Sequence, residues 1–382
     1  MAFTEGVRGP GWSNINIRSV ATLDTALPSS MSVTRGAGVW SEQTAAAANG
    51  TTFITRGTAE NTGRFWYSPT AGRRMLIIEP ARTNIVPYAN WVDGAEGEAN
   101  RPDNWGNIAG TSGVDYTPTA AVGPHGGYIF SMLDTATANR GVVQSGCTIL
   151  DATQYTWSIW TRRTGTAGAA SMFTFNAGAN FDITLDATLH DWMMEQATAT
   201  STGAGTNCYM CQNGDVPGVL HVALIQLEAG AYATSNIFNA AGAAGTSSRA
   251  AELCTVTGLN AASGYVSFLF EPWYANNTFS TIHTLLEWAP NWRLDYNGGT
   301  DTFDVVVNGT IRSTSAAQTF AKRSLHRLAV RYGAAGTELT VNGVTTTNST
   351  AWGTPVLASY LGSRAASANC ESAMYGDLLV AA

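Results

Sequence analysis

The stretch that decides the fold is YTWSIWT, Tyr155–Thr161, in which large apolar residues alternate with small polar ones. Successive side chains of a strand point to opposite faces, so this alternation predicts a β-strand with one buried face. Gly, Asn, Asp and Thr separate several further runs of the same kind: Phe181–Leu185 (FDITL), Tyr265–Phe270 (YVSFLF), Phe303–Val307 (FDVVV), Leu325–Tyr332 (LHRLAVRY) and Glu338–Val341 (ELTV). Many short strands between turn signals predict an all-β fold built of sandwiches.

The chain of 382 residues divides into three parts. Residues 1–84 are irregular in pattern and are expected to form an N-terminal segment. Residues 85–248 predict a first β-sandwich, a jelly roll that closes on the apolar strand His221–Glu228 (HVALIQLE). The small, Gly-rich stretch Phe238–Ser248 is typical of a linker. Residues 249–382 predict a second β-sandwich.

The composition excludes several classes of protein. Only 12% of the residues are charged, about half the usual share, and the net charge is -7. Lys322 is the one lysine, and no basic patch stands out, so we expect no binding of nucleic acid. Hydrophobic residues make up 45% of the chain, which is too many for disorder. No apolar run reaches the roughly 20 residues of a spanning helix, so we expect no insertion into a membrane. Residues 1–30 lack the layout of a secretion signal, so we expect the protein to be made in the cytoplasm.

The five cysteines, at positions 147, 208, 211, 254 and 370, have no regular spacing. An odd number without a pattern argues against a disulfide framework. Cys208 and Cys211 form a C-x-x-C motif, which can be redox-active or half of a zinc site. His221 is the nearest further ligand and stands alone. Ordinary cysteines of a strand or loop are therefore the favoured interpretation.

Calcium is the one metal whose binding the sequence suggests. Asp93, Glu96, Glu98 and Asp103 fall within one loop, and carboxylates are the ligands that Ca²⁺ prefers. No dense D-x-D loop is present, and a solvated acidic loop is the commoner arrangement. We therefore expect no cofactor, with Ca²⁺ as the alternative.

Local motifs add a resemblance to this pattern. They are Met75–Asn84 (MLIIEPARTN), Ile225–Ile237 (IQLEAGAYATSNI) and Ser248–Glu252 (SRAAE). Together they resemble a family of bacteriophage structural proteins that have an IE-ARTN entry strand, a carbohydrate-binding-module-like jelly roll and a Q-E-G-ATS-I exit. Tyr155–Thr161 resembles the YT-S-W strand of such jelly rolls. Asn236–Asn239 departs from the family's Y-I-P-T at the exit.

The C-terminal part resembles a laminin-G/concanavalin-A-like lectin sandwich. Four stretches carry this resemblance in the family's order: Leu325–Tyr332, Glu338–Gly343 (ELTVNG), Ser359–Gly362 (SYLG) and Tyr375–Val380 (YGDLLV). The two resemblances together imply a tail fibre, spike or head fibre on the surface of a virion or phage-like particle. They imply attachment to host-cell surface polysaccharide, and contact with other virion proteins through the N-terminal segment. They also imply a homo-oligomer, commonly a trimer, or a pentamer at a five-fold vertex.

Sugar binding requires aromatic faces for the C–H side of the ring and polar groups for the hydroxyls. Alternation places Trp157 toward the jelly-roll core and Trp160 and Arg162 on the other face of their strand. We expect Trp160, Arg162, Asp182 and Asp186 to lie on one ligand-facing sheet. The alternative, which we favour, is that Trp160 packs under a loop or at a subunit contact.

The second candidate site lies in the C-terminal sandwich. Trp288, Trp292 and Tyr296 cluster before the Gly298-Gly299 turn, and such a cluster can form a sugar platform at the rim of a sandwich. The same cluster can form core plus hairpin, which is the favoured interpretation. Asn308-Gly309 and Asn342-Gly343 predict further hairpin turns, because both residue types tolerate positive φ.

Catalysis is an alternative to binding, since a phage spike can also depolymerise a glycan. Hydrolysis requires two carboxyl groups roughly 5–10 Å apart. Asp182 and Asp186 are about 13 Å apart along an extended strand, which is too far. No G-x-S-x-G, H-E-x-x-H or phosphate-loop motif is present. We therefore expect binding without catalysis, with a depolymerase and a purely structural virion component as the alternatives.

Overall fold

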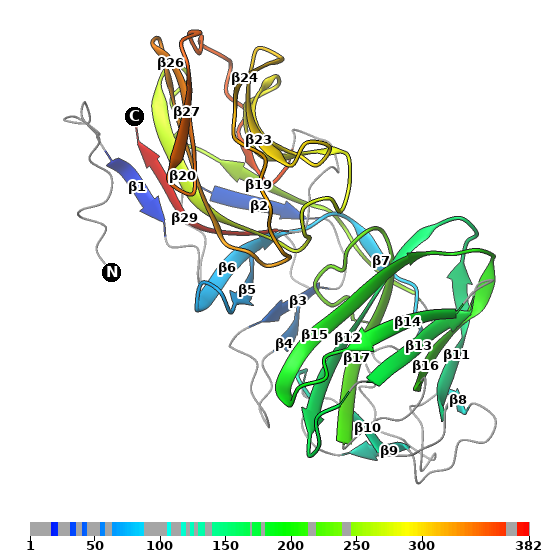
Figure 1. Ribbon diagram of the computed structural model, residues 1–382. Helices are drawn as coiled ribbons and strands as arrows, with labels where there is room; N and C mark the ends of the chain where they lie inside the picture. Colours follow the sequence, from blue (N-terminus) through cyan, green and yellow to red (C-terminus); the bar gives the residue numbers. More distant parts are fainter. Residues whose placement is uncertain are drawn as a thin grey trace.

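The computed structural model describes residues 17–21, 31–35, 40–43, 54–57, 63–87, 105–107, 116–119, 123–125, 129–133, 140–168, 170–176, 180–212, 219–238, 246–363 and 373–381. Strands and turns account for the regular structure of this part, which contains no helix. The predicted all-β class is confirmed. Figure 1 shows two sandwiches, one built around the C-terminal strands and one from the middle of the chain.

The C-terminal sandwich has an eight-stranded and a seven-stranded sheet. The first sheet contains, in spatial order, β27 (Val344–Asn348), β26 (Gly336–Val341), β25 (His326–Gly333), β20 (Gly264–Pro272), β29 (Ala373–Ala381), β6 (Arg73–Ile78) and β5 (Arg64–Ser68), with β1 (Ile17–Ala21) paired to β29. The second contains β2 (Met31–Arg35), β19 (Glu252–Val256), β28 (Tyr360–Leu361), β21 (Ile282–Ala289), β22 (Trp292–Asn297), β23 (Thr302–Val307) and β24 (Thr310–Thr314).

The jelly roll consists of two five-stranded sheets. One contains β15 (His190–Thr200), β12 (Gln154–Thr164), β17 (Val219–Ala229), β10 (Ile129–Leu133) and β9 (Tyr116–Thr119). The other contains β14 (Asn180–Leu185), β13 (Ala170–Asn176), β16 (Gly205–Gln212), β11 (Arg140–Ile149) and β8 (Gly106–Asn107). Two small ribbons lie where the sandwiches meet: β18 (Ser247–Arg249) with β7 (Arg82–Asn84), and β3 (Trp40–Gln43) with β4 (Ile54–Gly57).

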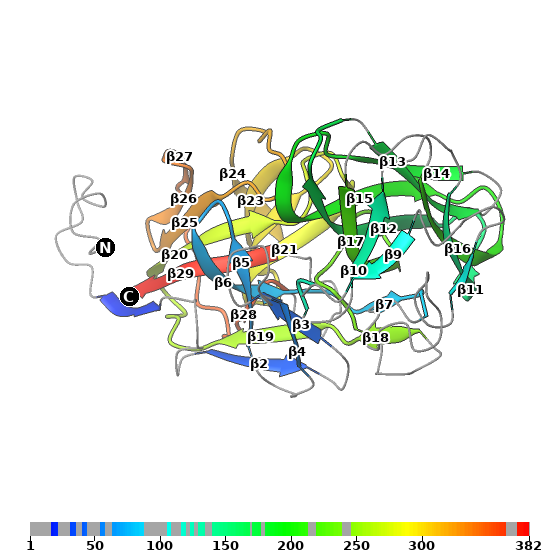
Figure 2. The same cartoon turned by 90° about the horizontal axis from the view of Figure 1, so that it is seen from below.

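Four of the N-terminal strands, β1, β2, β5 and β6, belong to the C-terminal sandwich. Strands β1 and β6 both pair with β29, and β2 extends the second sheet by pairing with β19. Figures 1 and 2 both show β1 beside β29, at the same end of the molecule. The described strands of residues 1–84 therefore do not form a segment apart, contrary to the division made from the sequence. Local pattern predicts a strand but not its partner, and these partners lie 217 to 364 positions away along the chain, as in the pairings of Arg35 with Glu252 and of Ile17 with Ala381.

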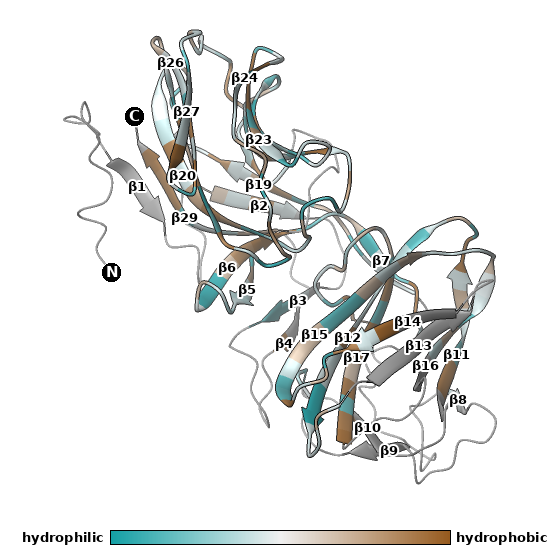
Figure 3. Ribbon diagram, in the orientation of Figure 1, coloured by the Kyte–Doolittle hydropathy of each residue, from teal (hydrophilic) through white to brown (hydrophobic). Residues whose placement is uncertain are grey.

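Three hydrophobic cores hold the chain together. The first fills the C-terminal sandwich and contains Trp288 and Tyr296, and the second fills the jelly roll around Trp157. A third core lies between the sandwiches, where residues of β5, β6 and β20 meet residues of β12, β15 and β17. Figure 3 shows β6 changing from hydrophilic at its first residues to hydrophobic along the rest, as its sequence RRMLII predicts. The third core makes the junction a packed interface rather than a flexible hinge.

Both predicted Asn-Gly hairpins are present. Asn308 and Gly309 have φ of 50° and 76°, and Asn342 and Gly343 have φ of 51° and 89°. Positive φ at both central residues is the condition for the tight turn that matches the twist of a hairpin. These turns connect β23 to β24 and β26 to β27.

His326 gives the C-terminal sandwich a dependence on pH. It is 5% exposed and packs against Phe270, Phe303 and Phe320. Burial lowers the pKa of His326 from 6.5 to about 4. The unfolded chain therefore takes up a proton below about pH 6.5 that the folded chain refuses until about pH 4, so stability is full above this window and is lost as the pH falls through it.

We expect His326→Phe to reduce this loss, which is at most about 3 kcal/mol for a pKa lowered this far. The measurement is urea unfolding of both proteins at about pH 7 and about pH 4.5. His221, whose pKa is also lowered to about 4 by burial and by Arg162, keeps its own share of the slope in the variant. An equal slope in the two proteins would contradict the prediction.

Candidate functional site

The four jelly-roll candidates do not share a sheet. Trp160 and Arg162 are on β12, whereas Asp182 is on β14 and Asp186 follows it, in the opposite sheet of the sandwich. The expectation of one ligand-facing sheet is therefore wrong. Alternation assigns each residue to a face of its own strand, but it does not say which sheet the strand joins.

Trp160 lies in the core between the sandwiches. It is 4% exposed, and its indole Nε1 donates a hydrogen bond to Asn236 Oδ1 at 2.8 Å. The β12–β17 register shifts between Ser158 and Trp160, and the facing Leu224 has a φ of 49°. Such a bulge re-aims side chains, and here it lies where Trp160 and Leu224 enter the shared core. Trp160 thus packs against the neighbouring sandwich instead of forming an open platform.

Arg162 and Asp186 contact other residues of the jelly roll. Arg162 Nε lies 3.8 Å from Asp191 Oδ1. Asp186 accepts hydrogen bonds from the backbone N and the Oγ1 of Thr188, and these bonds lower the pKa of Asp186. Asp182 pairs with Phe173 on β13.

The cluster of the C-terminal sandwich is core plus hairpin. Trp288 and Tyr296 are buried, and the ring of Trp288 meets that of Trp352 edge to face with centroids 5.1 Å apart. Trp292 is half-buried, and its Nε1 donates to the carbonyl of Trp352 at 2.9 Å. Tyr296 OH donates to Asp301 Oδ1 at 2.5 Å, and burial, together with this carboxylate, raises the pKa of Tyr296.

The structure places three of the cysteines and some of the candidate metal ligands. Cys147, Cys208 and Cys254 are buried free thiols, and burial raises the pKa of Cys208 and Cys254. Within the described ranges no group of three or more His, Cys, Asp or Glu could hold a metal ion. The acidic loop of Asp93, Glu96, Glu98 and Asp103 lies outside those ranges. The described residues contain no helix that is long and apolar enough to cross a membrane.

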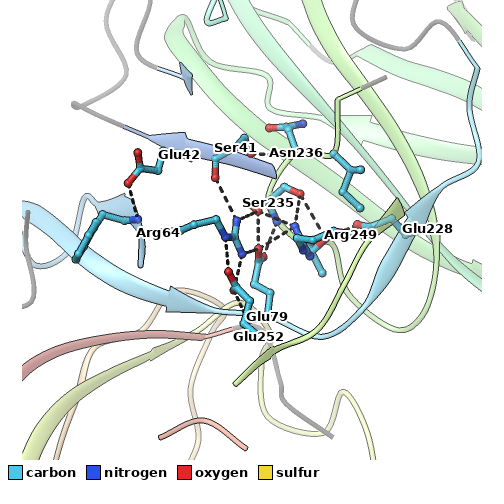
Figure 4. Close-up of polar contacts among 12 residues, drawn as sticks. Ser41, Glu42, Arg64, Glu79, Glu228, Ser235, Asn236, Arg249 and Glu252 are labelled. Carbon is cyan, nitrogen blue, oxygen red and sulfur yellow. Dashed lines mark hydrogen bonds and ion pairs between the residues drawn. The ribbon is translucent and has the colours of Figure 1, made fainter. Parts of the chain in front are cut away.

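A buried ionic cluster joins the sandwiches, and the residues of the sequence motifs build it (Figure 4). Arg64 of β5 donates from Nε to Glu252 Oε1 and from Nη2 to Glu79 Oε2, both at 2.6 Å. Arg249 Nη1 lies 2.9 Å from Glu79 Oε2, and these four side chains are completely buried. Ser235 bridges them, accepting from Arg64 Nη1 at 2.9 Å and donating from its backbone N to Glu79 Oε1 at 2.6 Å.

Opposite charges set the protonation of this cluster. Burial alone would raise the pKa of Glu79, but Arg249 and Arg64 outweigh burial and lower it to about 2. Burial alone would lower the pKa of Arg64, but Glu252 and Glu79 raise it. Glu228 lies at the edge of the cluster and accepts from Thr234 Oγ1 at 2.6 Å, while burial raises its pKa. The motifs thus encode the junction between the sandwiches rather than a reaction centre.

A cleft of about 430 Å³ opens beside this junction, within the usual range of about 300–1,000 Å³ for ligand sites. Its aromatic lining consists of Trp66, Tyr67, Trp160, Trp192 and Trp273. Its polar and charged lining includes Gln43, Gln196, Lys322 and Arg323. Both sandwiches contribute, because β12 and β15 belong to the jelly roll and β5 to the C-terminal sandwich.

The tryptophans form the deep wall of the cleft, since each is at most 4% exposed. Trp66 and Trp273 meet edge to face with ring centroids 5.3 Å apart. The buried indole Nε1 groups of Trp192 and Trp273 find no hydrogen-bond acceptor among the described residues. Tyr67 is half-buried, so it is the most accessible ring of the lining.

Sequence reasoning missed Trp66, Tyr67, Trp192 and Trp273 as cleft residues. They come from segments up to about 200 positions apart, which the pairing of the N-terminal strands with the C-terminal sandwich brings together. The one signal in the sequence was Lys322, the only lysine of the chain. Trp160 is the single predicted site residue that lines the cleft.

No protein-family model matches the chain, and no curated protein matches it. Among solved structures it is similar to a tandem CBM22-1–CBM22-2 domain of Paenibacillus barcinonensis Xyn10C, at 11% identity over 80% of this chain and 98% of that one, with a TM-score of 0.30. It is also similar to a family 16 carbohydrate-binding module-2, at 17% identity over 36% of this chain and 99% of that one, with a TM-score of 0.25.

A further similar structure holds the CBM22-1 and GH10 modules of the Clostridium thermocellum endo-1,4-beta-D-xylanase 10B with xylohexaose. The identity is 14%, the match spans 43% of this chain and 30% of that one, and the TM-score is 0.27. These neighbours contain carbohydrate-binding modules, but TM-scores of 0.30 or less establish neither a shared fold nor a shared ligand for this chain.

Proposed function

We propose that the chain binds a glycan in the cleft between its sandwiches and does not cleave it. The observation that carries the proposal is the grouping of aromatic rings, two amides and two cations around one cleft of suitable size. Aromatic side chains can pack on the C–H face of a sugar ring, while amides and cations can bond its hydroxyls. Both kinds of contact that a sugar needs are thus available at one place.

Binding without cleavage is proposed because of the chemistry of this lining. Hydrolysis of a glycosidic bond uses two carboxyl groups that flank the bond. The described residues that line the cleft supply rings, thioethers, amides and cations instead. A depolymerase would have to use another surface of the chain.

The biological setting that we propose follows from the motifs. Met75–Asn84 and Ile225–Ile237 resemble the entry and exit of the jelly roll in phage structural proteins, and Glu79 and Ser235 from these motifs bond to each other at the junction. We propose a fibre or spike component on the surface of a virion or phage-like particle, assembled as a homo-oligomer. It would attach the particle to host-cell surface polysaccharide and contact other virion proteins through its N-terminal segment.

Tyr67→Ala tests the binding proposal with little risk to the fold, because Tyr67 is only half-buried. We expect the variant to bind glycan about tenfold more weakly, the loss of roughly one aromatic contact of ~1.4 kcal/mol. Binding is measured by calorimetry with the polysaccharide that the unmodified protein selects on an array of bacterial surface polysaccharides. Tyr360→Ala is the matched control, since Tyr360 is a half-buried tyrosine on β28, in the other sheet.

A purely structural role is the second candidate function. The observation in its favour is that four tryptophans are almost completely buried in the core between the two sandwiches: Trp66, Trp160, Trp192 and Trp273. Under this role the protein would select no polysaccharide on the array and would not bind whole host cells. Binding to cells that is lost when their polysaccharide is stripped would decide against it.

A further inference from the structure

The charge on the cleft is carried by two neighbouring residues, Lys322 and Arg323, in the turn before β25. The two have different surroundings. Arg323 Nε donates to Glu271 Oε1 at 2.5 Å, and its Nη2 donates to the carbonyl of Tyr67 at 2.9 Å. Its guanidinium also lies over the ring of Trp273, 5.1 Å from the centroid. Arg323 is therefore a fixed part of the cleft wall, and Glu271 neutralises its charge.

The backbone of this turn is held in a strained conformation. Arg323 has a φ of 65°, a region that residues other than glycine rarely adopt. Its N donates to the carbonyl of Pro272 at 2.8 Å, and its carbonyl accepts from Thr70 Oγ1 at 3.1 Å. Strain of this kind persists only where the surroundings over-determine it, and it is concentrated at functional sites. Here it fixes the position of the preceding residue, Lys322, at the edge of the cleft.

Lys322 is exposed and lines the same cleft. Desolvation lowers the pKa of Lys322, and the negative charge of Glu195 opposes this shift. Glu195 is 7% exposed, and it already accepts hydrogen bonds from Thr161 Oγ1 and from the backbone N of Asp186. An ammonium group beside a carboxylate that is satisfied elsewhere remains available to a ligand anion.

We propose that the cleft selects acidic sugars and that the ammonium group of Lys322 pairs with the carboxylate of a uronic-acid-like unit. The ring of that unit packs against Tyr67. The exposed ammonium group of Lys322 and the half-buried ring of Tyr67 are complementary to the carboxylate and to the C–H face of such a unit. This inference rests on the proposed function and names the class of glycan.

The test compares each polysaccharide that binds on the bacterial array with its own carboxyl-reduced form, with polygalacturonate and its reduced form as references. We expect the unmodified protein to bind the acidic form at least tenfold more tightly, and Lys322→Gln to remove that preference, since a charge-assisted bond supplies about ten- to a hundredfold in affinity. Arg331→Gln, which removes an exposed cation of the same sandwich, should keep the preference.

Because Lys322 is the only lysine, an amine-directed reagent modifies it and the chain's α-amino group alone, and acidic ligand should protect Lys322 from the reagent. Equal binding of acidic and reduced forms, or a preference that survives in Lys322→Gln, would overturn the inference while leaving the proposed function in place. Failure of every polysaccharide to bind would overturn both.

Discussion

Arg64→Met is expected to lower the free energy of unfolding by about 3–5 kcal/mol, the usual result of removing one partner from a buried ion pair. Arg64 is completely buried and bonds Glu252, Glu79, Ser235 and the carbonyl of Ser41. Methionine fills much of the same volume, so the loss comes from the removed cation rather than from a cavity. Both carboxylates lose their contact with Arg64, and Glu79 keeps its contact with Arg249. Urea unfolding at constant pH measures it.

The pH dependence separates this electrostatic cause from a packing defect. In the unmodified chain the pKa of Glu79 is lowered to about 2, so its stabilising effect is present above its ordinary pKa of 4.5 and is lost as the pH falls toward 2. Without Arg64 we expect the pKa of Glu79 to rise, so the deficit of the variant grows as the pH rises above about 2. A deficit that is constant with pH would contradict this explanation.

Arg331→Met is the matched control for the same chemical change at the surface. The Arg331–Glu338 pair spans 3.2 Å, but its side chains are 51% and 36% exposed. Solvent and salt screen such a pair, so we expect a loss below about 1 kcal/mol. A loss as large as that of Arg64→Met would show that burial is not what makes the cluster important.

The sequence predicted the parts of the fold that local pattern can encode. Alternation placed Trp157 in the jelly-roll core, and Asn308-Gly309 and Asn342-Gly343 gave their hairpins. The pairing of β2 with β19 and of β6 with β29 could not be predicted, because it depends on long-range partners rather than on neighbouring residues. The same pairings assemble the cleft, which is why its residues were missed.

The motif residues also show that local sequence does not predict long-range contacts. Glu79, Ser235, Arg249 and Glu252 all belong to the motifs that resemble the entry and exit of the jelly roll in phage structural proteins. Only the folded chain shows that they meet, since their contacts span up to 173 positions, as between Glu79 N and Glu252 Oε2. A buried ionic cluster is costly to assemble with other partners, so it specifies one relative placement of the two sandwiches. The cleft between them depends on that placement.

The largest effect on the junction core is expected from Trp160→Ala. Removing a buried tryptophan costs about 3–5 kcal/mol, and here it would also leave Asn236 Oδ1 without its donor. Because Trp160 belongs to the core shared by both sandwiches, the loss should loosen their contact as well as the strand that carries it. We expect faster amide hydrogen exchange in β5 and β6 of the C-terminal sandwich, measured by mass spectrometry.

Trp157→Ala is the control, and it lies on the same strand, three residues earlier. Trp157 is completely buried in the core of the jelly roll, so its removal should cost a similar free energy. Its effect on exchange should stay within the jelly-roll strands β11, β12, β16 and β17 and leave β5 and β6 unchanged.

If exchange in β5 and β6 were unchanged in both variants, the sandwiches would not be coupled through Trp160. If exchange there were faster in both variants, the coupling would run through the jelly roll as a whole. A difference between two tryptophans three positions apart would assign the coupling to the face of β12 that carries Trp160.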